Sequence, residues 1–225
     1  MDEGWKQIGI MGGTFDPVHK AHLALAEQAY RQFSLDEVWM MPNGRPPHKR
    51  DHSQADVSHR MEMVRRAIAE IPYLRLCGLE QFEMSYHYTF ETIHILKDLF
   101  PKVQFYFIMG ADSLFDFVDW KRPDIISREC VILAATRDHC RKDEILQKIE
   151  ELKQLFGADI RILNTPNMDI ASEEIRKRLQ QGEDTSDMLP EGCSREDFRD
   201  PKIWKENDRY YALMANRSVT GGGQA

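Results

Sequence analysis

Short apolar segments alternate along the chain with stretches whose apolar residues recur every three or four positions. The apolar segments are typical of buried strands, and they lie at residues 7–11, 37–42, 74–79, 103–110, 131–136 and 160–163. The intervening stretches predict amphipathic helices near residues 19–33, 58–69, 89–100, 144–156 and 172–181. Because the strands are apolar throughout, this alternation favours an α/β protein with a doubly wound parallel sheet of about six strands.

The segment after about residue 182 differs from the rest of the chain, because it is polar, turn-rich and short of periodicity. Residues 202–217 predict one further helix, and the glycine-rich residues 220–225 are expected to form a flexible tail. We therefore expect one Rossmann-like domain over residues 1–190, with a small helical C-terminal portion and an extension at 191–225. Ligands of such sheets bind at the carboxyl ends of the strands, beside the point where strand order reverses.

Composition limits both the class of protein and the class of ligand. The chain has 225 residues, of which 42% are hydrophobic and 30% charged, and its net charge is −7. Such acidity argues against nucleic acid as a partner, so an anionic substrate needs local basic groups. The four cysteines lack metal-binding spacing, and neither a signal peptide nor a bilayer-spanning run is evident. We expect a cytoplasmic protein without a membrane partner, and the sequence leaves open whether it is a homo-oligomer.

One loop carries more chemistry than a turn requires. It reads GGTFDPVHKAH at residues 12–22, directly after the first apolar segment. Gly12 and Gly13 allow positive φ and bring backbone N–H groups close to an anion. His19 and His22 lie three residues apart at the start of a helix, whose N-terminal dipole attracts the same anion. The loop therefore predicts a phosphate site at the end of the first strand.

This loop resembles the signature of the nucleotidyltransferase superfamily, whose HxGH motif is shared with class I aminoacyl-tRNA synthetases. Four later segments are similar, in the same order, to those of bacterial nicotinate-mononucleotide adenylyltransferases. They are MPNGRPPHK at 41–49, SYHYTFETI at 85–93, IMGADSLFDFVDWKR at 108–122 and IASEEIR at 170–176. The resemblance covers about residues 7–190. It implies an enzyme of NAD biosynthesis that joins nicotinate mononucleotide to the AMP of ATP and releases pyrophosphate.

The resemblance also implies where ATP lies. The ATP-binding residues would be Gly12, Gly13, Thr14, Phe15, His19, His22, Gly110, Asp112, Ser172 and Arg176. Among them, His19, His22 and Arg176 would act in catalysis, and Asp112 would face the ribose, with a helix N-cap as its alternative role. Ser172 is expected at the N-cap of its helix, so that the helix N-terminus faces phosphate.

For the acceptor nucleotide, the resemblance implies a second set of residues: Asn43, His48, Lys49, Thr89 and Trp120. Trp120 would stack on the pyridine ring, and Thr89 with nearby N–H groups would receive its carboxylate. Without the family context, Trp120 would ordinarily be interpreted as a core residue. The basic loop at residues 45–52 would be interpreted as a solvated run of charges. Mg²⁺ is expected to arrive on the ATP phosphates. A metal site built from His48, His52 and His59 has poor spacing.

The reaction implied here needs no strong general base. A phosphate monoester is largely ionised at neutral pH, because its second pKa is about 6. The catalyst must instead hold two repelling anions in line and neutralise the charge that develops in the transition state. Hydrogen-bond donors and cations of the kind found in these segments meet that need.

Three positions depart from the family pattern: Ala21 replaces a glycine, Ala171 a serine and Glu173 a threonine. The C-terminal part also lacks the usual ending of the family. Rival functions are adenylyl transfer to nicotinamide mononucleotide or phosphopantetheine, and a non-catalytic nucleotide-binding module. Phosphopantetheine adenylyltransferases typically have Thr where His19 stands. A class I tRNA synthetase needs more than the 225 residues present.

Overall fold

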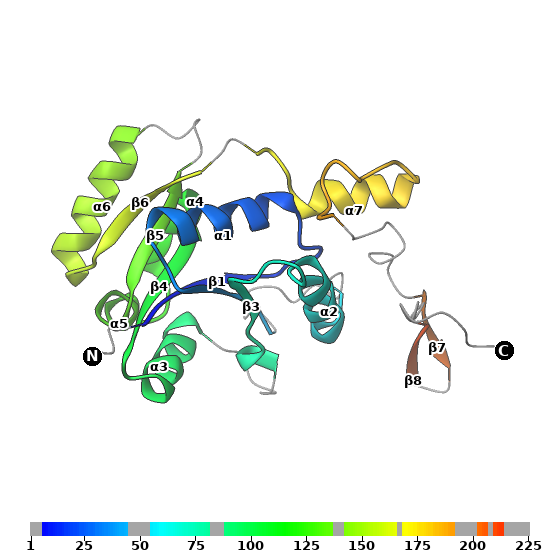
Figure 1. Cartoon of the computed structure of the whole chain (residues 1–225), viewed down its shortest axis with the longest axis horizontal. Helices are drawn as coiled ribbons and strands as arrows, with labels where there is room; N and C mark the ends of the chain where they lie inside the picture. Colours follow the sequence, from blue (N-terminus) through cyan, green and yellow to red (C-terminus); the bar gives the residue numbers. More distant parts are fainter. Residues whose placement is uncertain are drawn as a thin grey trace.

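In the computed structural model, six strands form one parallel sheet in the order β3-β2-β1-β4-β5-β6 (Figure 1). The structure describes residues 6–44, 55–81, 88–136, 142–165, 168–191, 202–206 and 209–213. The strands are β1 (Lys6–Gly13), β2 (Glu37–Pro42), β3 (Leu74–Leu76), β4 (Val103–Gly110), β5 (Val131–Thr136) and β6 (Ile160–Asn164). Strand order reverses between β1 and β4, as in doubly wound Rossmann-like sheets, which confirms the predicted fold class.

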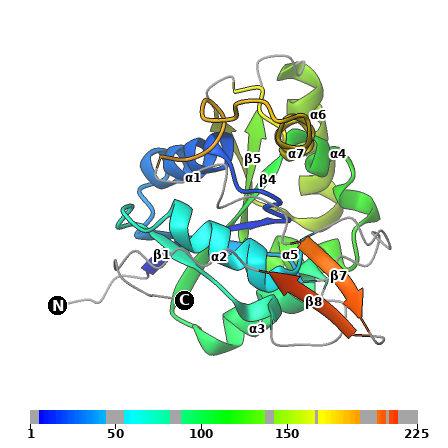
Figure 2. The ribbon, with the colours of Figure 1, turned by 90° about the vertical axis from the view of Figure 1, so that its right-hand side faces the viewer.

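Helices connect the strands and flank the sheet (Figures 1 and 2). They are α1 (Lys20–Gln32), α2 (Val57–Ala67), α3 (Thr89–Leu99), α4 (Ala111–Phe115), α5 (Pro123–Glu129), α6 (Lys142–Phe156) and α7 (Ser172–Gln181), with 3₁₀ turns η1 (Leu79–Gln81) and η2 (Phe117–Asp119). The sequence did not predict η1, η2 or α5, because elements of three to seven residues are too short to show a helical period. It offered α4 only through the alternative role of Asp112 as a helix N-cap. The strand predicted over 74–79 ends at Leu76.

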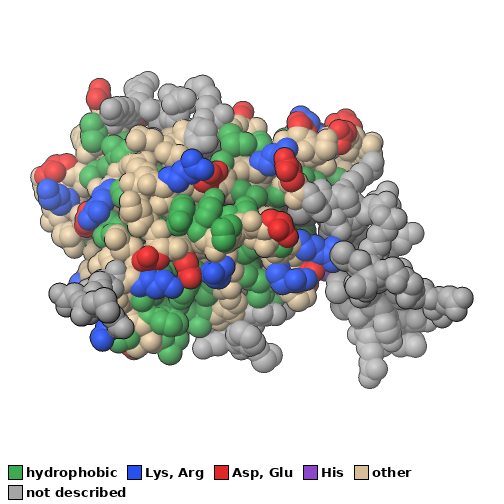
Figure 3. All heavy atoms as spheres, in the orientation of Figure 1, with side chains coloured by type: hydrophobic (Ala, Val, Ile, Leu, Met, Phe, Trp, Pro, Cys, Tyr) green, Lys and Arg blue, Asp and Glu red, His purple; other side chains and the backbone are tan. Residues whose placement is uncertain are grey.

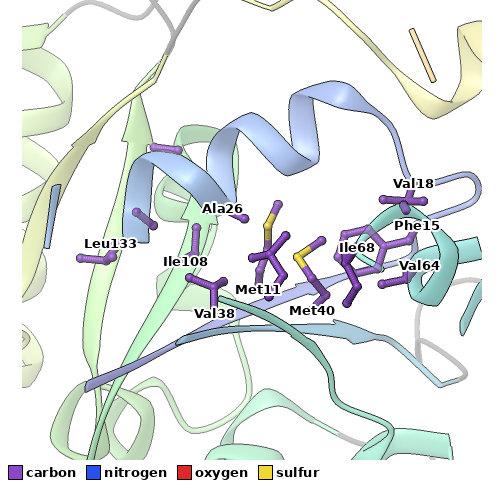
Figure 4. Close-up of a cluster of buried hydrophobic side chains, with 14 of the residues drawn as sticks. Met11, Phe15, Val18, Ala26, Val38, Met40, Val64, Ile68, Ile108 and Leu133 are labelled. Carbon is purple, nitrogen blue, oxygen red and sulfur yellow. The ribbon is translucent and has the colours of Figure 1, made fainter. Parts of the chain in front are cut away.

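The two faces of the sheet build two separate cores, because successive side chains of a strand point to opposite faces. One core packs α1, α2 and α7 on strand residues that include Met11, Val38, Met40, Ile108 and Leu133 (Figure 4). The other packs α3, α4, α5 and α6 on Ile8, Ile10, Phe105, Phe107 and Ile132. Phe15 and Val18, from the loop after β1, join the first core beside Val64 and Ile68 of the α2 segment (Figure 4).

The helix predicted for residues 202–217 is wrong. Two antiparallel strands, β7 (Lys202–Glu206) and β8 (Arg209–Leu213), form there instead. Branched and aromatic residues favour strands, and Trp204 and Tyr211 are direct register partners across the pair. The local strand preference of this segment therefore prevails over the helical interpretation.

The surface drawn in Figure 3 carries acidic and basic side chains interspersed, without a large field of one sign. This mixed pattern is consistent with a modest net charge of −7 in a chain with 30 basic and 37 acidic residues. Within the residues that the structure describes, no helix is long and apolar enough to cross a membrane.

Candidate active site

Four predicted site residues, Gly12, Gly13, Asn43 and Gly110, lie where β1, β2 and β4 end. β1 lies between β2 and β4, and its last residues pair with Met41 and Pro42 on one side. The Asn43 N–H, just beyond β2, donates to the Gly13 carbonyl at 2.8 Å. Gly110 ends β4 and is the N-cap of α4. This position, beside the reversal of strand order, is where ligands of doubly wound sheets bind.

Gly13 is required by a close approach and not by its backbone conformation. Neither Gly12 nor Gly13 has positive φ, so that expectation is wrong, and both still belong to β1. The left-handed residue of the loop is Phe15, with φ of 49°, and its buried ring packs in the first core. A Cβ on Gly13 would lie 3.0 Å from two atoms of that ring. Gly13 therefore lets the Phe15 ring anchor the loop in the core.

The two histidines stand side by side at the start of α1. His19 is the N-cap and is buried, and His22 is the third helical residue. Their rings are stacked with centroids 3.6 Å apart and planes 25° apart, as the three-residue spacing predicts. The Phe15 ring meets His22 edge-on at 4.9 Å. The core thus fixes the position of both imidazoles.

The surroundings of His22 favour its neutral form. Burial, followed by the neighbouring His19, holds the pKa of His22 well below its usual value of 6.5. The backbone N–H of His19 donates to Nδ1 of His22 at 3.2 Å. An acceptor Nδ1 leaves the ring proton on Nε2. His22 therefore has a ring N–H to donate to an anion without carrying a charge.

The first backbone N–H groups of α1 are only partly available to a ligand. The N–H of Lys20 donates to the Met188 carbonyl at 2.9 Å, and its ammonium donates to the Ser186 carbonyl at 3.0 Å. The segment after α7 thus satisfies a donor that we expected to face phosphate. The anion-binding donors of this site are therefore expected to come from the loop and the imidazoles more than from Lys20.

The start of α7 contacts the loop after β1 directly. The Ser172 hydroxyl donates to the Pro17 carbonyl at 3.0 Å, and the Arg176 guanidinium donates to the Asp16 carbonyl. The prediction that Ser172 is the N-cap is wrong, because the extended residue before the helix is Ala171. As the first helical residue, Ser172 aims its hydroxyl across to the loop. Glu173, which replaces a threonine of the family pattern, is exposed.

The acceptor-side residues lie on separate elements. Thr89 is the first residue of α3, and Trp120 follows η2 with a partly buried ring. That ring packs against Phe107 of β4 and Phe117, at centroid distances of 6.0 and 5.5 Å. Asp112 lies in the first turn of α4 and is exposed, and Gly110 takes the N-cap position that we considered for it. His48 and Lys49 lie outside the described residues.

Sequence reasoning missed Arg60, which is 2% exposed and contacts three segments at the site. Its guanidinium donates to the carbonyls of Thr14 and Asn43, both at 2.7 Å. The signal was present in its spacing, because Arg60 precedes the buried residues Val64 and Ala67 by four and seven positions. Sequence reasoning overlooked it because a charged residue on an apolar helix face is uncommon.

No group of three or more His, Cys, Asp or Glu side chains suited to a metal ion occurs in the part of the chain that the structure describes. The donor set at the loop is made of amides, imidazoles and guanidinium groups, which do not fit a hard divalent cation. Of the His48, His52 and His59 set, which the sequence already disfavoured for its spacing, only His59 falls within the described residues.

Comparisons with known proteins agree with this geometry. The chain matches the cytidylyltransferase-like family over residues 10–178. It is 39% identical over 186 residues to the probable nicotinate-nucleotide adenylyltransferase of Lachnoclostridium phytofermentans, covering 83% of this chain and 93% of that protein. The corresponding protein of Salinibacter ruber is 37% identical over 184 residues, covering 82% and 91%. The solved nicotinic acid mononucleotide adenylyltransferase of Plasmodium falciparum, complexed with NaAD, aligns with a TM-score of 0.65 at 26% identity, covering 82% and 90%.

Proposed function

Because the chain belongs to the nicotinate-nucleotide adenylyltransferase family, we propose that it transfers the AMP moiety of ATP to nicotinate mononucleotide. A phosphate oxygen of the acceptor forms a bond to the α-phosphorus of ATP. The bond between that phosphorus and the oxygen bridging to the β-phosphorus breaks, and pyrophosphate leaves with the electron pair. The products are nicotinate adenine dinucleotide and pyrophosphate.

The observation that carries this proposal is the stacked imidazole pair at the carboxyl end of β1. The two histidines belong to the first turn of α1, and their rings are held side by side there before any substrate binds. Donors fixed before the substrate arrives stabilise developing charge without reorganisation. A neutral Nε2–H of His22 can donate to a phosphate oxygen, so the site holds anions by hydrogen bonding and needs no proton transfer.

The roles of the remaining residues follow from their positions. We propose that the backbone N–H groups of the loop and Arg176 bind the ATP phosphates, and that Asp112 at the end of β4 accepts from ribose hydroxyls. Arg176 uses one nitrogen on the Asp16 carbonyl and keeps others for phosphate. The single hydroxyl proton of Ser172 is already donated to Pro17, so phosphate would have to displace that bond. Mg²⁺ would enter with ATP, neutralising phosphate charge.

On the acceptor side, we propose that Asn43, His48, Lys49, Thr89 and Trp120 bind nicotinate mononucleotide. Trp120 combines packing on Phe107 and Phe117 with a partly exposed ring, which supports a stacking role for its open part. The core and ligand interpretations of this residue are therefore compatible.

The test is pyrophosphate release from ATP with nicotinate mononucleotide, nicotinamide mononucleotide or phosphopantetheine in parallel. We expect fastest turnover with nicotinate mononucleotide. Turnover with phosphopantetheine alone would contradict the acceptor assignment. No turnover with any of the three, combined with stoichiometric ATP binding, would instead identify a non-catalytic nucleotide-binding module.

A further inference from the structure

Arg60 of α2 is a buried cation that bonds to backbone carbonyls from three segments. Nη1 donates to the Thr14 carbonyl at 2.7 Å, and Nη2 donates to the carbonyls of Asn43 and Gly44 at 2.7 and 3.2 Å. Nε donates to the Ala55 carbonyl at 3.0 Å. The planar guanidinium carries these donors in a fixed fork, so the segments are held at set distances from one another.

The segments that Arg60 joins belong to the two halves of the proposed site. Thr14 lies in the loop after β1, which we assign to the ATP phosphates. Asn43 and Gly44 follow β2, on the acceptor side. Gly44 and Ala55 are the residues directly before and after the sequence stretch 45–54, which holds His48 and Lys49. One side chain therefore spans both substrate-binding segments.

Arg60 also determines the direction of a loop amide. In a trans peptide the carbonyl and the following N–H point in opposite directions. Because the Thr14 carbonyl points at Arg60, the N–H of Phe15 points away from it. That N–H is one of the backbone donors that we assign to the ATP phosphates. The bond from Arg60 thus orients a phosphate donor without touching the ligand.

Burying this cation is costly, which argues against a purely packing role. Desolvation lowers the pKa of Arg60, and the carboxylates of Asp16, Asp56 and Glu80 oppose that effect. Two of these carboxylates also hold the same segments: Asp16 accepts from the Ala55 N–H, and Glu80 accepts from the Gly44 N–H, both at 3.2 Å. An apolar side chain would fill the space without this cost, but it could not bond to the four carbonyls.

We propose that Arg60 is a positioning residue that sets the spacing between the ATP-phosphate loop and the acceptor segment, and thereby the line of attack on the α-phosphorus. This inference rests on the proposed adenylyl transfer. It predicts that Arg60 governs the rate of the chemical step more than the affinity for either substrate alone, since misplacing bound reactants by about 1 Å can cost about 100-fold in rate.

The test replaces Arg60 by lysine, which keeps the charge and loses the planar fork. In Arg60→Lys we expect kcat to fall about 100-fold. The dissociation constants of ATP and of nicotinate mononucleotide, each measured alone by calorimetry, should change by less than about threefold, because the Phe15 N–H is one of several phosphate donors and each half of the site otherwise remains. Arg65→Lys is the matched control, because Arg65 lies on the same helix, is exposed and pairs with Glu62. Its kcat should equal that of the parent chain.

A structural role alone would give a different result. It would lower the thermal midpoint and the fraction of chain that binds ATP, while the molecules that still bind ATP would keep the parent kcat. That outcome, or a kcat within about threefold of the parent, would overturn the inference. If the lysine variant binds no ATP, the test is repeated with Arg60→Gln, which buries no charge and keeps one donor group. Its kcat and its dissociation constants for the two substrates then decide.

The proposed function and the inference fail in distinguishable ways. A parent chain that turns over no acceptor contradicts the proposed function. In that case the mutual effect of the two ligands on each other's affinity, measured by calorimetry, still tests Arg60. Loss of that mutual effect in Arg60→Lys supports the connection between the segments, and its retention overturns it.

Discussion

The two halves of the proposed site are built in different ways. The ATP-phosphate loop comes from one continuous stretch, and it is tied down by the Phe15 ring, by Arg60 and by the start of α7. The acceptor side takes single residues from the ends of several elements, such as Thr89 and Trp120. A loop that comes from one stretch can form a rigid site for an anion. The relative positions of residues from several elements depend instead on how those elements pack.

The largest effect should come from the rigid half, at His22. We expect His22→Ala to lower kcat/KM at least 100-fold, because removing one preorganised donor to a developing anion costs about that much. His22→Asn should lose as much activity, since the Asn oxygen replaces Nδ1 as acceptor but nothing replaces the Nε2–H. Steady-state kinetics and thermal melting of both variants check this.

The asparagine variant separates catalysis from folding. It keeps the acceptor for the His19 N–H, so its thermal midpoint should stay within about 2 °C of the parent. Near-parent activity in His22→Asn would show that only the Nδ1 side of the ring matters. A collapsed fold in both variants would mean that the histidine is structural.

On the dispersed half, we expect a smaller and substrate-specific effect. Trp120→Ala should raise KM for nicotinate mononucleotide about 10-fold and leave the affinity for ATP unchanged, because stacking of a base on an aromatic ring is worth about 1–3 kcal/mol. Trp120→Phe should keep most of the affinity. Phe115→Ala, at a nearby exposed phenylalanine, is the control and should change neither constant. Equal losses of affinity for ATP and for nicotinate mononucleotide would indicate that Trp120 only packs in the core.

The close approach at Gly13 can be tested through stability. Gly13→Ala should lower the free energy of unfolding by about 1 kcal/mol, because the added methyl would lie 3.0 Å from a fully buried ring. Gly110→Ala is the comparison, since a Cβ there has nothing within 4 Å. It should change stability by less than about 0.5 kcal/mol. Chemical denaturation of the two variants compares them, and equal effects would contradict the role of the Phe15 ring.

The last effect, similar in size to that at Gly13, concerns pH. Because the folded chain holds the pKa of His22 below 6.5, the unfolded chain binds this proton first as pH falls. Folding stability should therefore decline between pH 6.5 and 5.5, by about 1 kcal/mol from this group. The decline should be smaller in His22→Asn. Nitrogen-15 NMR of the free chain should show the Nε2–H tautomer at pH 7, and a charged His22 at that pH would contradict the assignment.

Much of the fold could be predicted from the sequence, because the apolar segments and helical periods of the sheet are strong and local. Strand β4 and helix α7 occur with the predicted bounds. The sequence failed where structure depends on distant contacts. The N-cap at Ala171 reflects the reach of Ser172 to Pro17, and the role of Arg60 requires three segments to meet. The pairing of β7 with β8 likewise depends on two segments meeting, which a search for helical periodicity does not detect.

At the site, the contiguous motif correctly predicted the contact that depends only on the spacing of residues within the motif. The pairing of His19 and His22 follows from three residues of helix, and the structure places them in contact. The reason for glycine at position 13 could not be predicted, since it depends on where the Phe15 ring packs. Nor could the hydrogen-bond partner of the Lys20 N–H be predicted, because Met188 lies far along the chain. The roles of Asn43, Thr89, Asp112 and Trp120 stay predictions that the variants above test.

The central claim is that an acceptor phosphate attacks the α-phosphorus of ATP at the end of β1. The most direct measurement uses nicotinate mononucleotide with oxygen-18 in its phosphate and follows the label by mass spectrometry. The account predicts that the labelled oxygens, including the new bridging oxygen, appear in the dinucleotide, and that pyrophosphate carries no label. Label in pyrophosphate, or unlabelled AMP without dinucleotide, would contradict the account.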